Sequence, residues 1–284
     1  MDYIIKQFPD KKFDTKMDQT RFIKSHFDEM KQKKMADYKS NSFALIDNIT
    51  KKEFIPLIEN VTSDFIRVKT VINSTNIIDS HLDLHMPEVW NKTVSDNPYT
   101  YHLKQHEAIF ESVISNKAKN YNEKSNFLNL GLDVDFKTVI NINEFIIDKK
   151  KEPFMFDKYV NGDVMQHSVG MIYVSIDIAY YDEDSQKQMD FFEEMKKKAV
   201  NPDIADEYGY FWVVYEAKKR EGSAVVFGSN SVTPTLYVKN YEPSKKDTQK
   251  KNSEPFEDTH KDEPQSSTQI DYDYLTKKII NLKM

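Results

Sequence analysis

Residues 164–174, which read VMQHSVGMIYV, combine a serine with the alternating pattern of a half-buried strand. A strand sends successive side chains to opposite faces, so Ser168 shares one face with Gly170 and Ile172. A serine at the start of a strand is held by a rigid element, and the glycine leaves room for a substrate or another backbone. This position suits a nucleophilic serine, although an ordinary strand serine has the same pattern. A suitable base elsewhere in the chain would favour the nucleophile over the ordinary strand serine.

A serine becomes an effective nucleophile where a positioned base takes its proton and a third group orients that base. His106 is the candidate base, and Glu221 is the candidate carboxylate that orients it. They lie far from Ser168 in sequence, so only the fold can join them. Chain order is no obstacle, because such constellations recur in different orders on unrelated folds. The sequence leaves open whether Glu221, His102 or His167 is the third member.

A second candidate site consists of His81, Asp83 and His85, which lie on one face if the segment is extended. Two imidazoles and a carboxylate can bind zinc or manganese. The same alternation also arises in polar loops, and the chain has no separate motif for a fourth ligand. We therefore expect a structural role for this cluster and predict no metal or other cofactor. A metal-dependent hydrolase that uses these residues remains the alternative.

The composition excludes several classes of function. The 284 residues include no cysteine, so disulfide scaffolds, thiolate zinc sites and cysteine nucleophiles are ruled out. The net charge of −6 and the scattered basic residues give no reason to expect nucleic acid as a partner. There is no glycine-rich phosphate loop, no apolar run of the ~20 residues that a membrane span needs, and no signal-peptide core. We expect an intracellular protein without a membrane partner.

Alternating patterns predict strands at 65–72, 127–136 and 139–147, besides the serine strand, and two strands separated by a charged bend within 210–226. Helices are predicted near 87–95 and 185–200. Strands outnumber helices in the central part of the chain. We therefore predict an α+β fold with a mostly antiparallel, barrel-like sheet surrounded by helices.

The chain divides into four predicted parts. Residues 1–40 are expected to be a helical extension that packs on the domain, and residues 41–243 to be the catalytic domain. Residues 244–270 are polar and contain prolines, which predicts a disordered linker. Residues 271–284 carry a narrow apolar stripe, which predicts a short amphipathic helix that forms only against a surface, either of a partner protein or of the chain's own domain. The stripe consists of Tyr272, Leu275, Ile279 and Leu282.

Four separated stretches resemble blocks of the tailed-phage (caudoviral) prohead protease family, which matures capsids. They are DSHLDLHMPEVW at 79–90, LKQHE at 103–107, HSVGM at 167–171 and EGSAVVFGSN at 221–230. Their order and approximate spacing agree with the family over about residues 60–235. The sequence departs from the family pattern at Leu82 and Glu88, where the family usually has glycines.

This resemblance implies a serine endopeptidase with a fold like that of herpesvirus assemblin, with Ser168 as nucleophile and His106 as general base. It implies cleavage of the scaffold protein and of the N-terminal segment of the major capsid protein, inside the prohead in the host cytoplasm. Self-association or self-cleavage is also expected from the family. A non-catalytic scaffold or capsid-assembly protein with the same fold remains a further alternative.

Overall fold

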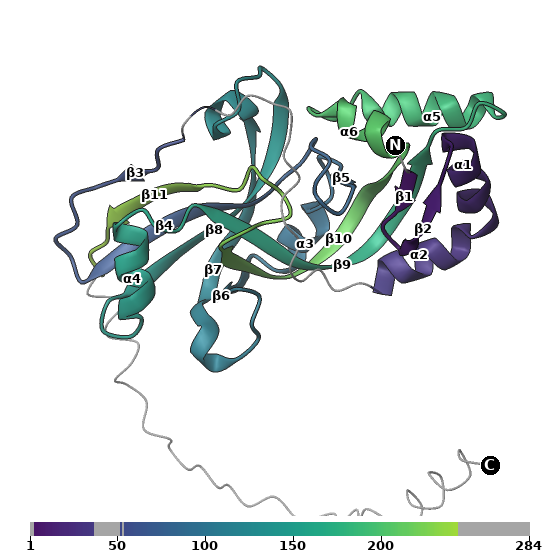
Figure 1. The fold of residues 1–284 in the computed structure, drawn as a ribbon. Helices are drawn as coiled ribbons and strands as arrows, with labels where there is room; N and C mark the ends of the chain where they lie inside the picture. The colour runs from purple at the N-terminus through teal and green to yellow at the C-terminus, as the bar shows by residue number, and fades with distance from the viewer. Residues whose placement is uncertain (1–2, 37–51, 53, 244–284) are drawn as a thin grey trace, which may run out of the picture. The chain divides into compact units, whose positions relative to one another are not determined.

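The structure, a computed structural model, describes residues 3–36, 52 and 54–243 (Figure 1). This part of the chain is α+β, as predicted, with helices and short 3-10 helices (η) around a mixed sheet. The helices are α1 (Lys16–Ser25), α2 (Phe27–Ala36), α3 (Asn91–Asp96), η1 (Phe110–Ser112), η2 (Phe127–Leu130), α4 (Pro153–Val160), α5 (Gln186–Lys196) and α6 (Pro202–Tyr208). The strands are β1 (Tyr3–Ile5), β2 (Phe8–Phe13), β3 (Leu57–Ile58), β4 (Phe65–Ser74), β5 (Asp83–His85), β6 (Tyr99–Lys104), β7 (Val113–Asn126), β8 (Lys137–Asp148), β9 (Gln166–Tyr180), β10 (Tyr210–Val225) and β11 (Thr235–Asn240).

The large sheet has the strand order β3-β11-β4-β8-β7-β6-β10-β5, and β9 pairs with β10. Most ladders are antiparallel; β10 is parallel to both β5 and β6, and β11 is parallel to β3. Among the described strands no ladder joins the two ends of this order, so the expectation of a barrel is wrong in that respect. The long β10 pairs with β5 near its start and with β6 near its end. The sheet therefore branches at β10.

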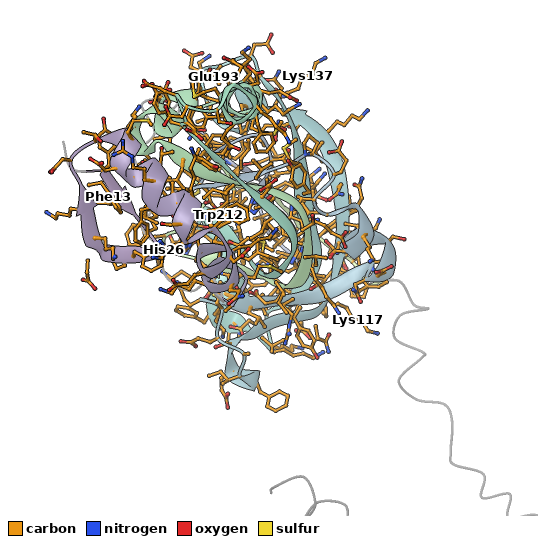
Figure 2. The ribbon with its side chains drawn as sticks, turned by 90° about the vertical axis from the view of Figure 1, so that its right-hand side faces the viewer. Phe13, His26, Lys117, Lys137, Glu193 and Trp212 are labelled. Carbon is orange, nitrogen blue, oxygen red and sulfur yellow. The ribbon has the colours of Figure 1, made fainter. Side chains whose placement is uncertain are left out.

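The first half of β10 supplies the centre of the main core. Residues 210–214, YFWVV, are all buried, as expected for a strand covered on both faces. Side chains of β9 and α5 pack against it, including Ile178 and Phe192. In Figure 2, Trp212 lies in the interior beside the N-terminal helices, while Lys117 and Lys137 are at the periphery.

The N-terminal segment is more than the predicted helical extension. It begins with the β1–β2 hairpin, and α1 and α2 follow. Ile5, Ile23 and Met30 are fully buried in the same core as β10. The helical segment therefore packs on the domain, as expected, and the described residues up to Glu242 group as one compact unit. The predicted linker and tail helix at 244–284 lie outside the described residues.

Two predicted elements differ from the structure. Residues 127–136 form η2 and a loop closed by Gly131 at φ 91°, because Phe127 and Leu130 turn into the core where a strand would alternate. The strand in this region is β7, whose sequence is mostly polar. The predicted pair of strands within 210–226 is the single strand β10, in which bulges near Glu216 and Arg220 absorb the charged bend. Among the described residues, no helix is long and apolar enough to cross a membrane.

Candidate active site

The registers of three strands bring the predicted catalytic stretches together. In the antiparallel β9–β10 ladder, Ser168 lies opposite Ser223 and Gly170 lies opposite Glu221. On the other side of β10, the parallel ladder places Leu103 of β6 beside Ser223. Residues directly opposite each other share a face of the sheet. Ser168, Ser223 and Glu221 therefore lie on one face, with the end of β6 next to them.

His106 reaches this face through a tight turn after β6. Gln105 and His106 both adopt the left-handed backbone conformation, with φ of 51° and 61°. This conformation costs a non-glycine residue roughly 1–2 kcal/mol. Two bonds to β10 hold the turn: Gln105 N donates to Ala224 O at 3.0 Å, and His106 N donates to Ser223 Oγ at 3.2 Å. Backbone strain of this kind is frequent where a side chain must be aimed at a site.

The imidazole of His106 is held by a carboxylate. Its Nδ1 lies 2.6 Å from Glu221 Oε1, and both side chains are almost completely buried. A carboxylate accepts the bond, so Nδ1 carries the proton and Nε2 is left as the basic nitrogen. The predicted contact between Glu221 and His106 is therefore present, in the orientation that a general base needs.

Ser223 is a residue that the sequence interpretation missed. Its Oγ donates to Glu221 Oε2 at 2.6 Å and accepts from the backbone of His106. One hydroxyl thus fixes both the carboxylate and the turn that carries the base. The sequence feature that could have identified Ser223 is its position two residues after Glu221 on one strand, which places both side chains on the same face.

Ser168 itself is nearly buried, at 9% exposure, and lies directly across the ladder from Ser223. Within the described part of the chain, no hydrogen bond joins Ser168 Oγ to His106. Catalytic pairs often tighten only when substrate binds. The fold therefore brings Ser168, His106 and Glu221 to one site, and their catalytic roles stay predictions.

His102 and His167, the other candidates for the third member, lie on the opposite face of these strands and are fully buried. His102 Nδ1 contacts Asn143 Nδ2 at 3.1 Å, and His102 Nε2 contacts the Tyr159 hydroxyl at 3.1 Å. The same hydroxyl contacts His167 Nε2 at 3.2 Å, and His167 Nδ1 contacts Thr233 O at 3.0 Å. Neither histidine has a hydrogen bond to His106 in the described structure. Glu221 is the only one of the three candidates that bonds to the base there.

The hydrogen bonds of this buried network can run from donor to acceptor in only one direction. At one end Lys219 Nζ, which can only donate, bonds to Asn143 Oδ1 at 2.7 Å and to the amide oxygens of Asn120 and Asn141. At the other end the Thr233 carbonyl can only accept. Each group between them therefore donates onward, which requires both histidines to be neutral.

The pKa values of the two histidines agree with that requirement. Burial, with His167 and Lys219 nearby, holds the pKa of His102 well below its usual range. Burial also lowers the pKa of His167 to about 4, opposed by its bond to Thr233. The pKa of Lys219 is lowered to about 7 by burial, while the charge of Glu221 raises it. A fully bonded polar layer thus supports the strands from behind the site.

In the cluster of His81, Asp83 and His85, the side chains of Asp83 and His85 contact other buried polar side chains. Asp83 is fully buried, pairs with Lys34 Nζ at 2.6 Å and accepts from the Tyr173 hydroxyl at 2.5 Å. His85 Nδ1 contacts Asn73 Nδ2 at 3.0 Å. The described residues contain no group of three histidine or acidic side chains that could hold a metal ion. The alternative metal site therefore has no support in this geometry.

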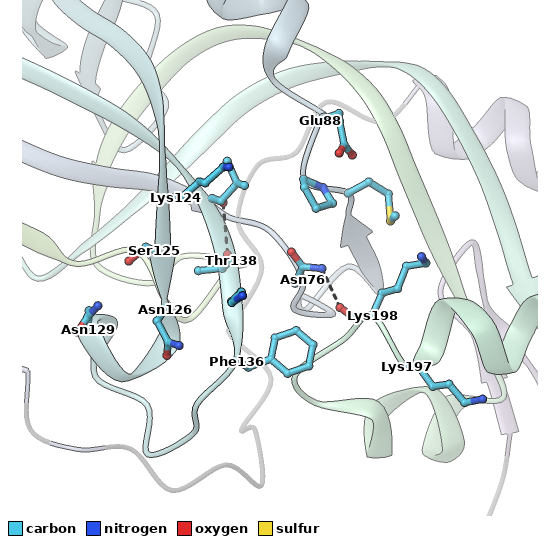
Figure 3. Close-up of a pocket in the computed structure, with 14 residues that line it drawn as sticks. Asn76, Glu88, Lys124, Ser125, Asn126, Asn129, Phe136, Thr138, Lys197 and Lys198 are labelled. Carbon is cyan, nitrogen blue, oxygen red and sulfur yellow. Dashed lines mark hydrogen bonds between the residues drawn. The ribbon is translucent and has the colours of Figure 1, made fainter.

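Two of the pockets in the described structure adjoin this part of the molecule. One of about 310 Å³ includes Glu221 in its lining, and one of about 520 Å³ includes Gln105, so they flank the turn that carries His106. A third, of about 1000 Å³, is shown in Figure 3, where Lys124 comes from one side and Lys197 and Lys198 from the other. Its lining contains none of the predicted catalytic residues, so we assign it no part in the predicted chemistry.

No protein-family model, curated protein or solved structure matches this chain.

Proposed function

We propose that this protein is a serine endopeptidase, with Ser168 as nucleophile, His106 as general base and Glu221 as the carboxylate that orients the base. The observation that carries the proposal is the 2.6 Å bond between His106 Nδ1 and Glu221 Oε1 on the same sheet face as Ser168. A buried imidazole with Nδ1 bound to a carboxylate is set up to accept a proton at Nε2. The serine is on a rigid strand beside it.

In this mechanism His106 Nε2 takes the proton of Ser168 Oγ while the oxygen attacks a peptide carbonyl carbon. The imidazolium that forms donates from Nδ1 to Glu221, whose charge stabilises it. His106 then protonates the leaving amine, and the peptide bond breaks. In the second half, water gives a proton to His106 and attacks the acyl-serine ester; His106 then returns the proton to Ser168 Oγ as the ester bond breaks and the acid leaves.

We propose further that the enzyme is a prohead maturation protease with an assemblin-like fold. The four stretches that resemble that family all adjoin β10: residues 79–90 contain its partner β5, residues 103–107 begin at the end of its partner β6, residues 167–171 lie on β9, and residues 221–230 include its own end. Such convergence supports the resemblance. The corresponding substrates are the scaffold protein, the N-terminal segment of the major capsid protein and the protease itself, cleaved inside the prohead.

The Ser168→Ala variant tests this function. It removes one nearly buried oxygen, so the fold should remain and cleavage of an unfolded protein substrate should fall at least a thousandfold, on the order measured for triad serines. Ser175→Ala is the matched control, because Ser175 is an exposed serine on the same strand. Its activity should equal that of the wild type. Equal activity in Ser168→Ala would refute the assignment.

A further inference from the structure

The pocket of about 310 Å³ next to Glu221 is apolar on most of its surface. Its apolar lining consists of Tyr101, Leu103, Ala108, Ile109, Phe110 and Val113. Arg220 and Glu221 complete it. The pocket is therefore built from β6, from the segment that follows His106 and from the bulged part of β10.

The pocket is continuous with the candidate site. Tyr101 is the ladder partner of Glu221, and Leu103 is the ladder partner of Ser223, so both point to the catalytic face. Ala108 and Ile109 follow His106 by two and three residues in the chain. The segment that aims the base thus also forms a wall of the pocket.

Several of the lining side chains are unusually exposed for their type. Phe110 is 94% exposed, Ile109 is 55% exposed and Tyr101 is 51% exposed. Grouped apolar side chains on a surface typically mark a binding site, because burying them gains about 25 cal/mol per Å². Their place beside His106 makes the substrate the natural occupant.

We propose that this pocket binds one apolar side chain of the substrate, close to the bond that is cleaved. The inference rests on the proposed endopeptidase function and adds a substrate class: peptides with leucine, isoleucine, methionine or phenylalanine at one position near the cut. The volume of about 310 Å³ is at the lower end of small-molecule pockets and suits a single large side chain. Such a residue would cover Ile109 and Phe110 while the backbone passes Ser168.

The test is digestion of a random peptide library by the full-length protein, with cleavage sites mapped by mass spectrometry. We expect one position within three residues of the cut to be enriched about tenfold or more in large apolar residues, as pocket contacts of this size discriminate by 10–200-fold. Cleavage without any apolar preference would overturn the inference while leaving the proposed function intact. A library left uncut, or cut equally by Ser168→Ala, would refute the proposed function and the inference with it.

A matched pair of variants assigns the preference to the pocket. Ile109→Asp puts a carboxylate into the lining, and should reduce cleavage of apolar-selected peptides at least tenfold. Leu57→Asp changes a side chain of similar exposure on β3 that lines none of the three pockets, and should leave cleavage unchanged. An unchanged preference in Ile109→Asp would overturn the inference.

Discussion

At the residue scale, the central interaction is the short bond between His106 and Glu221. A carboxylate can only accept, so it fixes the tautomer of the imidazole, and its charge stabilises the imidazolium formed during catalysis; a neutral amide lacks that charge and can also present an N–H to Nδ1. Both carboxylate oxygens are used, one by His106 and one by Ser223. The role of Glu221 therefore depends on its charge and on its position.

Glu221→Gln keeps the shape of the side chain and removes its charge. We expect kcat to fall by about 10²–10⁴, since a substitution of this type in a triad puts the imidazole in the wrong tautomer. The thermal midpoint should change little. Glu216→Gln on the same strand is the control, because Glu216 pairs only with the exposed Lys92 in the described structure. Equal kcat values for the two variants would show that Glu221 does not orient the base.

Sequence analysis proposed three members of this candidate site and did not include Ser223. Ser168, His106 and Glu221 are of residue types that carry hydrolytic chemistry. Their types, and their places in the stretches that resemble the protease family, were enough to single them out. Ser223 is recognisable only from the register that puts it opposite Ser168 and beneath the His106 turn. Register depends on pairings between strands that are far apart in the chain, and local sequence patterns do not reveal those pairings.

At the element scale, β9 and β10 carry the site on one face and a buried polar network on the other. The alternation in 164–174 predicted a half-buried strand, and in β9 Met171 and Tyr173 are buried while Ile172 and Val174 are exposed. The pattern failed for β7, whose polar sequence becomes a strand because β6 and β8 pair with it on both sides. Pairing with its neighbours therefore made β7 a strand, although its local sequence pattern does not predict one.

The Tyr159 hydroxyl is the central link of the polar network, since it joins His102 to His167. Tyr159→Phe would leave the Nε2 atoms of both buried imidazoles without a partner. We expect the free energy of unfolding to fall by about 1–3 kcal/mol, the usual cost of unsatisfied buried groups. Denaturant titration measures this. Tyr99→Phe, at a 61% exposed tyrosine, should change stability by no more than ~0.5 kcal/mol. A similar small change for Tyr159→Phe would mean that the network adds no stability.

At the scale of the whole molecule, one buried ion pair ties the N-terminal helices to the sheet. Lys34 on α2 bonds to Asp83 on β5, and Tyr173 on β9 bonds to the same carboxylate. The sequence suggested the acidic residue as a metal ligand or a loop residue. The pairing was not predictable because Lys34 lies in a helix of weak amphipathic pattern, far away in the chain.

Lys34→Ala would leave the Asp83 carboxylate buried without its cation. We expect a loss of about 3–5 kcal/mol in the free energy of unfolding, as for other buried pairs broken on one side. Lys33→Ala is the control, because Lys33 is a half-exposed neighbour that pairs with Glu29 on the surface. It should cost no more than about 1 kcal/mol. Equal effects of the two variants would show that the N-terminal helices are not held by this pair.

The central claim is that Ser168 is a nucleophile activated by His106, and covalent labelling measures this most directly. Treating the full-length protein with a fluorophosphonate and digesting it for mass spectrometry should give a single adduct, on the peptide that contains Ser168. The adduct should disappear in His106→Ala and persist in Ser175→Ala. No adduct on the wild-type protein, or one on Ser168 that forms equally fast without His106, would contradict the account.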